Sequence, residues 1–284
     1  MSSYAVRQAL AHVAQLSRGR ALDRALRVTL NFHPDRLHEG RPILTAMAQD
    51  GVYKSQFETR TSNGGLTAFP GGDRWLWESQ IFGGWYNGVD ASLRPKYGAL
   101  NHRHRAVGGA PRFGSAHFRS TPDVLDRTSF CFPDSVFEPE DFGVAAACNL
   151  LDLVELAAPE FLDDYVEAHV HGVVDLEQDV EALVLDPCFR GTPVEEQAAQ
   201  LPCPVEWHGG FQLTVAQLKS LASTRDPRFG PLLPFVKGGL SLARGGVLTP
   251  RHIGEAVRAG RHPEAALKRV WFVLARFGQV SSAG

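Results

Sequence analysis

The most constraining stretch of the sequence is the run of residues 165–172, which reads Tyr-Val-Glu-Ala-His-Val-His-Gly. Side chains alternate between the two faces of a β-strand. A strand here therefore turns three small apolar residues to one face and Glu167, His169 and His171 to the other. The apolar face requires a core behind it. The polar face is either the wall of an active-site cleft or a decorated strand surface, and both interpretations stay open at this point.

Composition narrows the class of protein. Of the 284 residues, 44% are hydrophobic and 21% are charged, which is enough apolar material for a substantial core. The net charge of −2 gives no strong attraction to nucleic acid or to an anionic membrane. No apolar run reaches the roughly 20 residues that span a bilayer, and the N-terminus lacks a signal-peptide core. We expect a soluble protein that binds neither nucleic acid nor membranes.

The four cysteines do not indicate a zinc ribbon or a disulfide scaffold. Cys131, Cys148, Cys188 and Cys203 are far apart and form no Cys-x-x-Cys pair. We expect reduced thiols, and no local signature marks one of them as a nucleophile.

Hydrophobic periodicity predicts an α+β fold with helices at both ends. Residues 4–27 have helical spacing, and residues 249–277 do so again, with Thr249 and Pro250 suited to the start of a helix. Strand-like runs fill the centre, at 27–32, 94–101, 111–118, 128–132, 180–185 and 205–213, with helices at 144–156 and 192–200. We expect an N-terminal helical extension over 1–26, a core domain over 27–245 and a C-terminal helical segment over 246–284 packed on it.

Two further features look functional. Proline disfavours helix at the residue before it, so His33 in His33-Pro34 ends the strand-like run at 27–32, where side chains often meet ligands. The glycine-rich run at 62–65 allows close backbone approach to a phosphate. It lacks a complete phosphate-binding signature, so a turn-rich scaffold is the alternative.

Five segments together resemble the ADP-ribosyltransferases. They read Asn-Phe-His-Pro-Asp-Arg, Ser-Asn-Gly-Gly-Leu-Thr-Ala, Arg-Pro-Lys-Tyr-Gly-Ala-Leu-Asn, Arg-Phe-Gly-Ser and Tyr-Val-Glu-Ala-His-Val-His-Gly. In the branch of diphtheria toxin and the poly-ADP-ribose polymerases, a histidine ends the first core strand, a tyrosine follows on a later strand and a glutamate lies on a C-terminal core strand. His33, Tyr97 and Glu167 occur in that order. Over roughly residues 27 to 245 the sequence is similar to a bacterial family long labelled as a domain of unknown function, and within that family to CteC-type effectors.

The resemblance implies a fold, a reaction and a setting. The fold is a split β-sandwich that holds NAD in a cleft between small sheets. The reaction attaches ADP-ribose from NAD, without a metal, to a threonine of host ubiquitin and so blocks ubiquitination. The protein would be a monomeric bacterial effector, delivered into the host cytoplasm by a route such as type III secretion and without a cleaved signal peptide. The Glu-x-Glu pattern of arginine-modifying relatives is absent, which disfavours arginine as the acceptor.

The resemblance also implies residue roles. Cleavage of the bond between nicotinamide and ribose develops positive charge on the sugar, which Glu167 would stabilise. Glu167 would also hold ribose hydroxyls and assist deprotonation of the incoming threonine. His33 would hydrogen-bond the adenosine ribose, Tyr97 would stack on nicotinamide, and His169 or His171 would orient Glu167 or act as a base. The residues expected to contact NAD are His33, Arg36, Ser62, Asn63, Gly64, Tyr97, Gly98, Arg112 and His171. For Arg36 and Arg112, a surface ion pair is the alternative.

Two other functions remain open. Glu167, His169 and His171, completed by His33 or His117, would suit zinc or iron in a metal-dependent hydrolase or a cupin-like protein. A noncatalytic binding module that uses Trp75 or Trp85 is the third. The essential acid is also open, since Glu181 and Glu206 lie on later strand-like runs.

Overall fold

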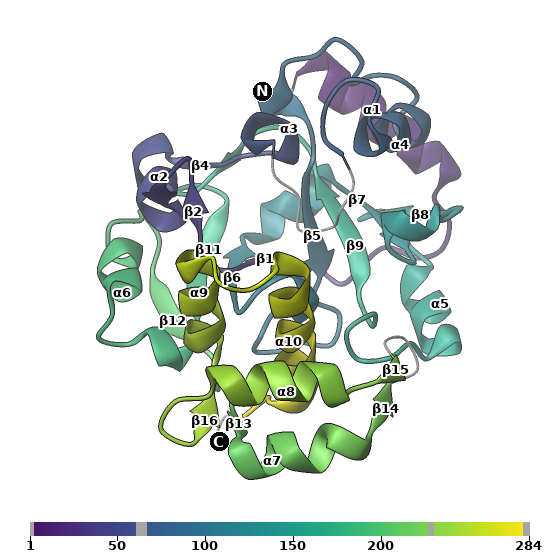
Figure 1. The fold of residues 1–284 in the computed structure, drawn as a ribbon. Helices are drawn as coiled ribbons and strands as arrows, with labels where there is room; N and C mark the ends of the chain where they lie inside the picture. Colours follow the sequence, from purple (N-terminus) through teal and green to yellow (C-terminus); the bar gives the residue numbers. More distant parts are fainter. Residues whose placement is uncertain (1–2, 61–66, 227–229, 281–284) are drawn as a thin grey trace.

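The computed structural model describes residues 3–60, 67–226 and 230–280. Its centre is an eight-stranded sheet in the order β12-β11-β6-β1-β5-β9-β7-β8 (Figure 1). Neighbouring strands are antiparallel except β11 and β12, which are parallel. The strands are β1 Val28–Phe32, β5 Lys96–Leu100, β6 Ala116–Ser120, β7 Thr128–Phe132, β8 Asp141–Val144, β9 Val166–Val170, β11 Val180–Leu185 and β12 Val205–Trp207. The fold is therefore mixed α/β around one large sheet.

Shorter elements surround the sheet. The helices are α1 Tyr4–Leu16, α2 Ile43–Asp50, α3 Gln56–Thr59, α4 Asp73–Ile81, α5 Leu150–Ala157, α6 Pro193–Ala198, α7 Val215–Ser220, α8 Leu233–Leu242, α9 Pro250–Ala259 and α10 Glu264–Phe277. Two-residue strands are β2 Leu37–His38, β3 Arg41–Pro42, β4 Val52–Tyr53, β10 Val174–Asp175, β13 Leu213–Thr214, β14 Arg225–Asp226, β15 Gly230–Pro231 and β16 Val247–Leu248. Single 3-10 turns are Ala91–Leu93, Pro111–Phe113, Pro122–Arg127, Ser135–Phe137, Pro187–Phe189 and Leu221–Ser223. No helix in these described ranges is long and apolar enough to cross a membrane.

Strands β1 and β5 separate along their length. β1 pairs with β6 from Thr29 to Phe32, whereas its pairing with β5 stops after Val28 and Thr29. Where they do pair, the strands approach closely, because a Cβ at Gly98 would lie 2.5 Å from the carbonyl oxygen of Thr29. The second half of β1 and the first half of β5 are therefore free to form two walls with a space between them.

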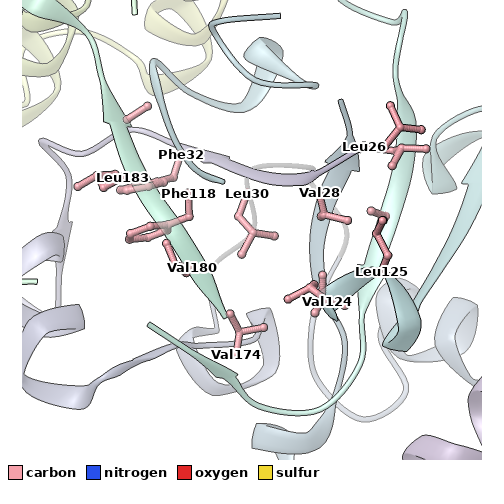
Figure 2. Packing of buried hydrophobic residues seen from close by; sticks show 14 of the residues in the cluster. Leu26, Val28, Leu30, Phe32, Phe118, Val124, Leu125, Val174, Val180 and Leu183 are labelled. Atoms are coloured by element: carbon pink, nitrogen blue, oxygen red, sulfur yellow. The ribbon is translucent and has the colours of Figure 1, made fainter. Parts of the chain in front are cut away.

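The predicted division of faces along β9 is correct. Val166, Ala168 and Val170 lie in the main hydrophobic cluster. The same cluster receives Val28 and Leu30 of β1, and Figure 2 shows these two side chains among others of this core. The strand thus turns its apolar residues to the core, as alternation requires.

The polar face of β9 is not open to solvent. Helices α1 and α4 and the turns after α4 cover it with a third hydrophobic cluster, to which Phe82 and Tyr86 belong (Figure 1). The Phe82 ring meets both His169 and His171 edge to face, at centroid distances of 5.6 and 5.0 Å. Both histidines are fully buried. The N-terminal helix is therefore part of the cover over the polar face.

The C-terminal helices form a second core. Its cluster contains Val107 and Leu162 and, from Phe211 to Ala275, residues of α7, α8, α9 and α10, so the boundary expected between 245 and 246 falls inside it. The helix expected over 249–277 is two helices, since Gly260 adopts a positive φ of 64° and Pro263 caps α10. Trp271 joins this core to the central sheet, donating from Nε1 to the carbonyl of Arg112 at 3.0 Å and meeting the His33 ring edge to face.

Trp271→Ala should destabilise the protein strongly. Its side chain is 2% exposed, and truncating a buried tryptophan costs about 3–5 kcal/mol through lost burial and the cavity that remains. Trp85→Ala is the matched control, because Trp85 is 38% exposed and should cost about 1 kcal/mol or less. Urea denaturation of both variants measures the difference, and equal losses would contradict the role assigned to Trp271.

Candidate functional site

A cleft of about 470 Å³ lies where β1 and β5 separate. Its walls include His33 and Arg36, which follow β1, Tyr97 and Gly98 of β5, and Glu167 of β9. The residues expected to form the site from three distant segments therefore meet in one cavity. Gly98 has a packing role as well, since any side chain there would collide with β1.

Glu167 is held by a set of buried donors. The carboxylate is in a side chain only 5% exposed, and it accepts hydrogen bonds from His169 Nε2 at 2.9 Å and from Ser135 Oγ at 3.1 Å. Burial alone would raise the pKa of Glu167. The hydrogen bond and charge of His169, with Arg74 and Ser135, outweigh burial and hold that pKa below its ordinary value. Glu167 is thus an ionised carboxylate of fixed orientation at the cleft.

The two histidines of β9 differ in their relation to Glu167. His169 contacts it directly, and the other ring nitrogen of His169 lies 3.2 Å from Ser129 Oγ. His171 instead lies 2.8 Å from Ser129 Oγ and 2.6 Å from the hydroxyl of Tyr86. His171 does not line the cleft, because the end of β9 that carries it is covered by the turns after α4. The structure therefore does not bring His171 to the expected NAD contact.

Tyr97 lines the cleft with one ring face covered. The guanidinium of Arg74 lies 3.9 Å from the ring centroid, and its Nη1 donates to Ser135 Oγ at 2.9 Å. Arg74 Nε is buried and has no hydrogen-bond partner in the described part of the chain. The Tyr97 hydroxyl donates to Glu78 Oε1 at 3.0 Å. The face of Tyr97 on which nicotinamide was expected to stack carries a planar cation of the protein itself.

The buried carboxyl of Glu78 and the guanidinium of Arg94 support this arrangement from behind. Glu78 is fully buried, and its Oε2 accepts from Arg94 Nη1 at 2.6 Å. Burial raises the pKa of Glu78 to about 7, although Arg94 and Arg74 oppose the shift.

Arg74 and Glu78 had no distinguishing signal in the sequence. They are four residues apart on α4 with opposite charge, which is the spacing of an ordinary exposed helix pair. Only the tertiary contact of α4 with Tyr97 makes them part of the site.

His33 and Arg36 occupy the opposite wall of the cleft. The His33 ring meets Trp271 at 4.9 Å, and burial together with the Arg36 charge lowers the pKa of His33 to about 3. His33 is therefore neutral at physiological pH and can both donate and accept a hydrogen bond. Arg36 Nη1 is buried and has no hydrogen-bond partner within the described ranges, so it is in a position to receive an anionic group.

Several expected residues lie elsewhere. Arg112 does not line the cleft and pairs with Asp163. Ser62, Asn63 and Gly64 fall outside the described residues.

The two alternative acids line a different cavity. Glu181 pairs with Arg27 at 2.8 Å and with Arg119 at 3.0 Å, and Glu206 pairs with Arg119 at 2.7 Å. This second cavity measures about 400 Å³ and also contains His117. The carboxylates of Glu181 and Glu206 are thus already paired with arginines, and neither residue lines the first cleft.

Glu167 and two buried neighbours have the composition of a metal site. Cys131, Glu167 and His169 each offer one ligand atom, and these atoms lie within 4.8 Å of one another. The expected set contained His171 in place of Cys131. The difference follows from strand pairing, because Cys131 of β7 lies directly across from Glu167 of β9. Burial, and then the charge of Glu167, raises the pKa of the Cys131 thiol, so the thiol is protonated here.

Comparison with known proteins gives a family without an activity. The family model described as "Protein of unknown function (DUF3626)" matches residues 27–157 and 144–273. The first match contains His33 and Tyr97, and the second contains Glu167. The search of curated proteins finds no match.

The Glu78 carboxyl should make stability depend on pH. It stays protonated in the folded protein up to about pH 7 but ionises near 4.5 when unfolded. The folded state therefore retains a proton that the unfolded state has lost, and wild-type stability falls as pH rises through that window. Between about pH 4.5 and pH 7, the free energy of unfolding of the wild type should fall by about 3 kcal/mol relative to that of Glu78→Gln.

Urea denaturation across that pH range measures the effect of Glu78→Gln. Glu177→Gln, at an exposed position, is the control and should follow the wild type. A difference between wild type and Glu78→Gln that does not change with pH would contradict the raised pKa.

Proposed function

We infer that this chain, which belongs to the DUF3626 family of proteins of unknown function, is a mono-ADP-ribosyltransferase that transfers ADP-ribose from NAD to a protein side chain. One observation carries the proposal. His33 directly follows β1, and Tyr97 and Glu167 lie on β5 and β9. These three strands are adjacent in the sheet, and all three residues line one cleft. If the resemblance to ADP-ribosyltransferases reflects a shared site, these three residues must lie together. If the short motifs matched by chance, there would be no reason for them to do so.

The electrostatics of Glu167 suit the reaction. Loss of nicotinamide from NAD leaves an oxocarbenium-like sugar whose positive charge a fixed carboxylate stabilises. The low pKa of Glu167 keeps it ionised, and His169 and Ser135 keep it oriented before substrate arrives. Such a group loses little energy to reorganisation during the reaction.

The other wall suits the remainder of NAD. A neutral His33 can hydrogen-bond ribose hydroxyls, and Arg36 can receive the diphosphate, since its Nη1 has no hydrogen-bond partner among the residues that the structure describes. Nicotinamide in NAD is a planar cation, as is the guanidinium that covers Tyr97. We propose that nicotinamide takes this position and that Arg74 moves aside when NAD binds.

The acceptor and the setting come from the resemblance to CteC-type effectors. We propose that the acceptor is a threonine of host ubiquitin and that the chain acts as a monomeric bacterial effector in the host cytoplasm. In this proposal the reaction uses NAD as co-substrate and requires no metal.

A metal-dependent hydrolase is the second candidate. The cluster of Cys131, Glu167 and His169 favours it, because a thiolate, a carboxylate and an imidazole are suitable zinc ligands. The two candidates differ in one property, since only the hydrolase depends on a bound ion. Elemental analysis of the purified protein and activity in the presence of a chelator separate them.

Ubiquitin incubated with the protein, NAD and EDTA should gain the mass of one ADP-ribose unit. Glu167→Gln should lower the rate at least about 100-fold, since it removes the charge that stabilises the transition state. Glu206→Gln is the matched control and should retain activity, because Glu206 binds Arg119 away from the cleft. Intact-mass spectrometry measures the modification. Equal loss in both variants, or modification that EDTA abolishes, would contradict the proposal.

Arg36→Ala should weaken NAD binding about tenfold or more, the cost of losing a charge-assisted hydrogen bond to the diphosphate. Arg112→Ala should change affinity little, since Arg112 pairs with Asp163 outside the cleft. Isothermal titration calorimetry with NAD measures both. A larger effect of Arg112 than of Arg36 would place the diphosphate elsewhere.

A further inference from the structure

A second carboxylate, Asp134, faces the cleft beside Glu167. It follows β7 and lines the same cavity. Ser135 Oγ lies 3.1 Å from Glu167 Oε2 and 3.4 Å from Asp134 Oδ1, so one hydroxyl contacts both carboxylates. Asp134 is half-buried and next to the exposed Val136, whereas Glu167 is 5% exposed. Asp134 therefore lies on the solvent side of Glu167, where an acceptor from another protein would enter.

The orientation of Asp134 is fixed. Oδ1 accepts the backbone N–H of Val136 at 2.8 Å, and Oδ2 accepts the hydroxyl of Tyr165. Tyr165 is buried and stands two residues before Glu167 in the chain. The two carboxylates are thus tied to one another through Ser135 on one side and through the start of β9 on the other.

The surroundings shift the two acids in opposite directions. Burial, and then the charge of Glu167, raises the pKa of Asp134, although Tyr165, the Val136 N–H and the Arg112 charge oppose the shift. The pKa of Glu167 is lowered. When the environment separates two neighbouring acids in this way, the one with the lower pKa stays ionised and the other exchanges protons.

The other carboxylates of the cleft do not compete for this role. Within the described ranges, Asp50 and Glu264 also line it. Asp50 pairs with Lys54 at 2.7 Å, and Glu264 acts on Arg36, on the wall opposite Glu167. The buried Glu78 is committed to Arg94 and Tyr97.

We propose that Asp134 is the catalytic residue that takes the proton from the acceptor and that the acceptor is an alcohol, an inference that rests on the proposed function. A neutral hydroxyl must lose its proton as it attacks the sugar. The C1′–N bond breaks with its electron pair going to nicotinamide, which leaves as a neutral molecule. The acceptor oxygen bonds to C1′, and its proton passes to the Asp134 carboxylate and then to water.

Asp134→Asn tests this inference by separating two reactions of the wild-type chain. Ubiquitin modification should fall about 100-fold or more, the usual contribution of a general base. NAD hydrolysis without acceptor should stay within about twofold, because the water that captures the sugar can pass its proton to solvent. NAD affinity should not change. In the wild type, the ratio of transfer to hydrolysis should increase with pH as Asp134 ionises. In Asp134→Asn, this ratio should not depend on pH in the same way.

Two further variants complete the test. Asp134→Glu keeps a carboxylate and should recover part of the transfer rate. Thermal unfolding checks that Asp134→Asn folds, and if it does not, the transfer rate of Asp134→Glu decides the question. Asp123→Asn, at an exposed carboxylate, should leave both reactions unchanged.

Three results would overturn the inference. Transfer at the wild-type rate in Asp134→Asn would show that Asp134 takes no proton. Equal loss of transfer and hydrolysis would make Asp134 a positioning residue for Glu167. A wild-type protein that cleaves no NAD at all would refute the proposed function itself, and this inference with it.

Discussion

The cleft depends on the short pairing between β1 and β5. The two strands are joined at Val28 and Thr29, where Gly98 permits a close approach, and they separate beyond that point. Had the pairing continued, Phe32 and Tyr97 would belong to one closed sheet with no space for a ligand. Because β1 instead keeps its full pairing with β6, and β5 keeps its pairing with β9, each wall remains rigid on its own side. The sheet is therefore interrupted at one seam without losing the support of either half.

The polar face of β9 shows how the protein stabilises charge without exposing it. Ser129 Oγ lies within hydrogen-bond distance of both His169 and His171, and Tyr86 satisfies the remaining nitrogen of His171. Buried polar groups are costly unless each finds a partner, and a complete network is correspondingly rigid. This network ends at Glu167, so the rigidity of the covered face is transmitted to the Glu167 carboxylate at the cleft. His171 then contributes to the site only through Ser129 and His169.

Local patterns in the sequence predicted the strands well and the site in part. Alternation along residues 165–172 gave the correct faces of β9, and the proline after His33 correctly ended β1. Alternation does not reveal which distant segment covers a face, so it left open whether the polar face of β9 lines a cleft or meets solvent, and it did not predict the burial of His169 and His171. Arg74, Ser135 and Asp134 were missed for a related reason. Their neighbours in the chain are unremarkable, and their role arises from contacts with Tyr97 and Glu167 across the fold. The spacing of apolar residues also did not predict that one hydrophobic core includes residues on both sides of the boundary expected between 245 and 246.

The two walls of the cleft are supported by different cores, and this has a consequence for binding. The His33 wall is backed by Trp271 and the C-terminal helices, whereas the Tyr97 and Glu167 wall is backed by α1 and α4. A ligand that contacts both walls bridges two hydrophobic cores that meet mainly through the sheet. Binding across such a junction couples ligand affinity to the relative position of the two supports, because a small shift of either core changes the width of the cavity. Arg74, which covers the ring face of Tyr97, belongs to α4, the helix that supports this wall. Movement of Arg74 is thus a local change on α4 that can open one wall while the His33 wall stays in place.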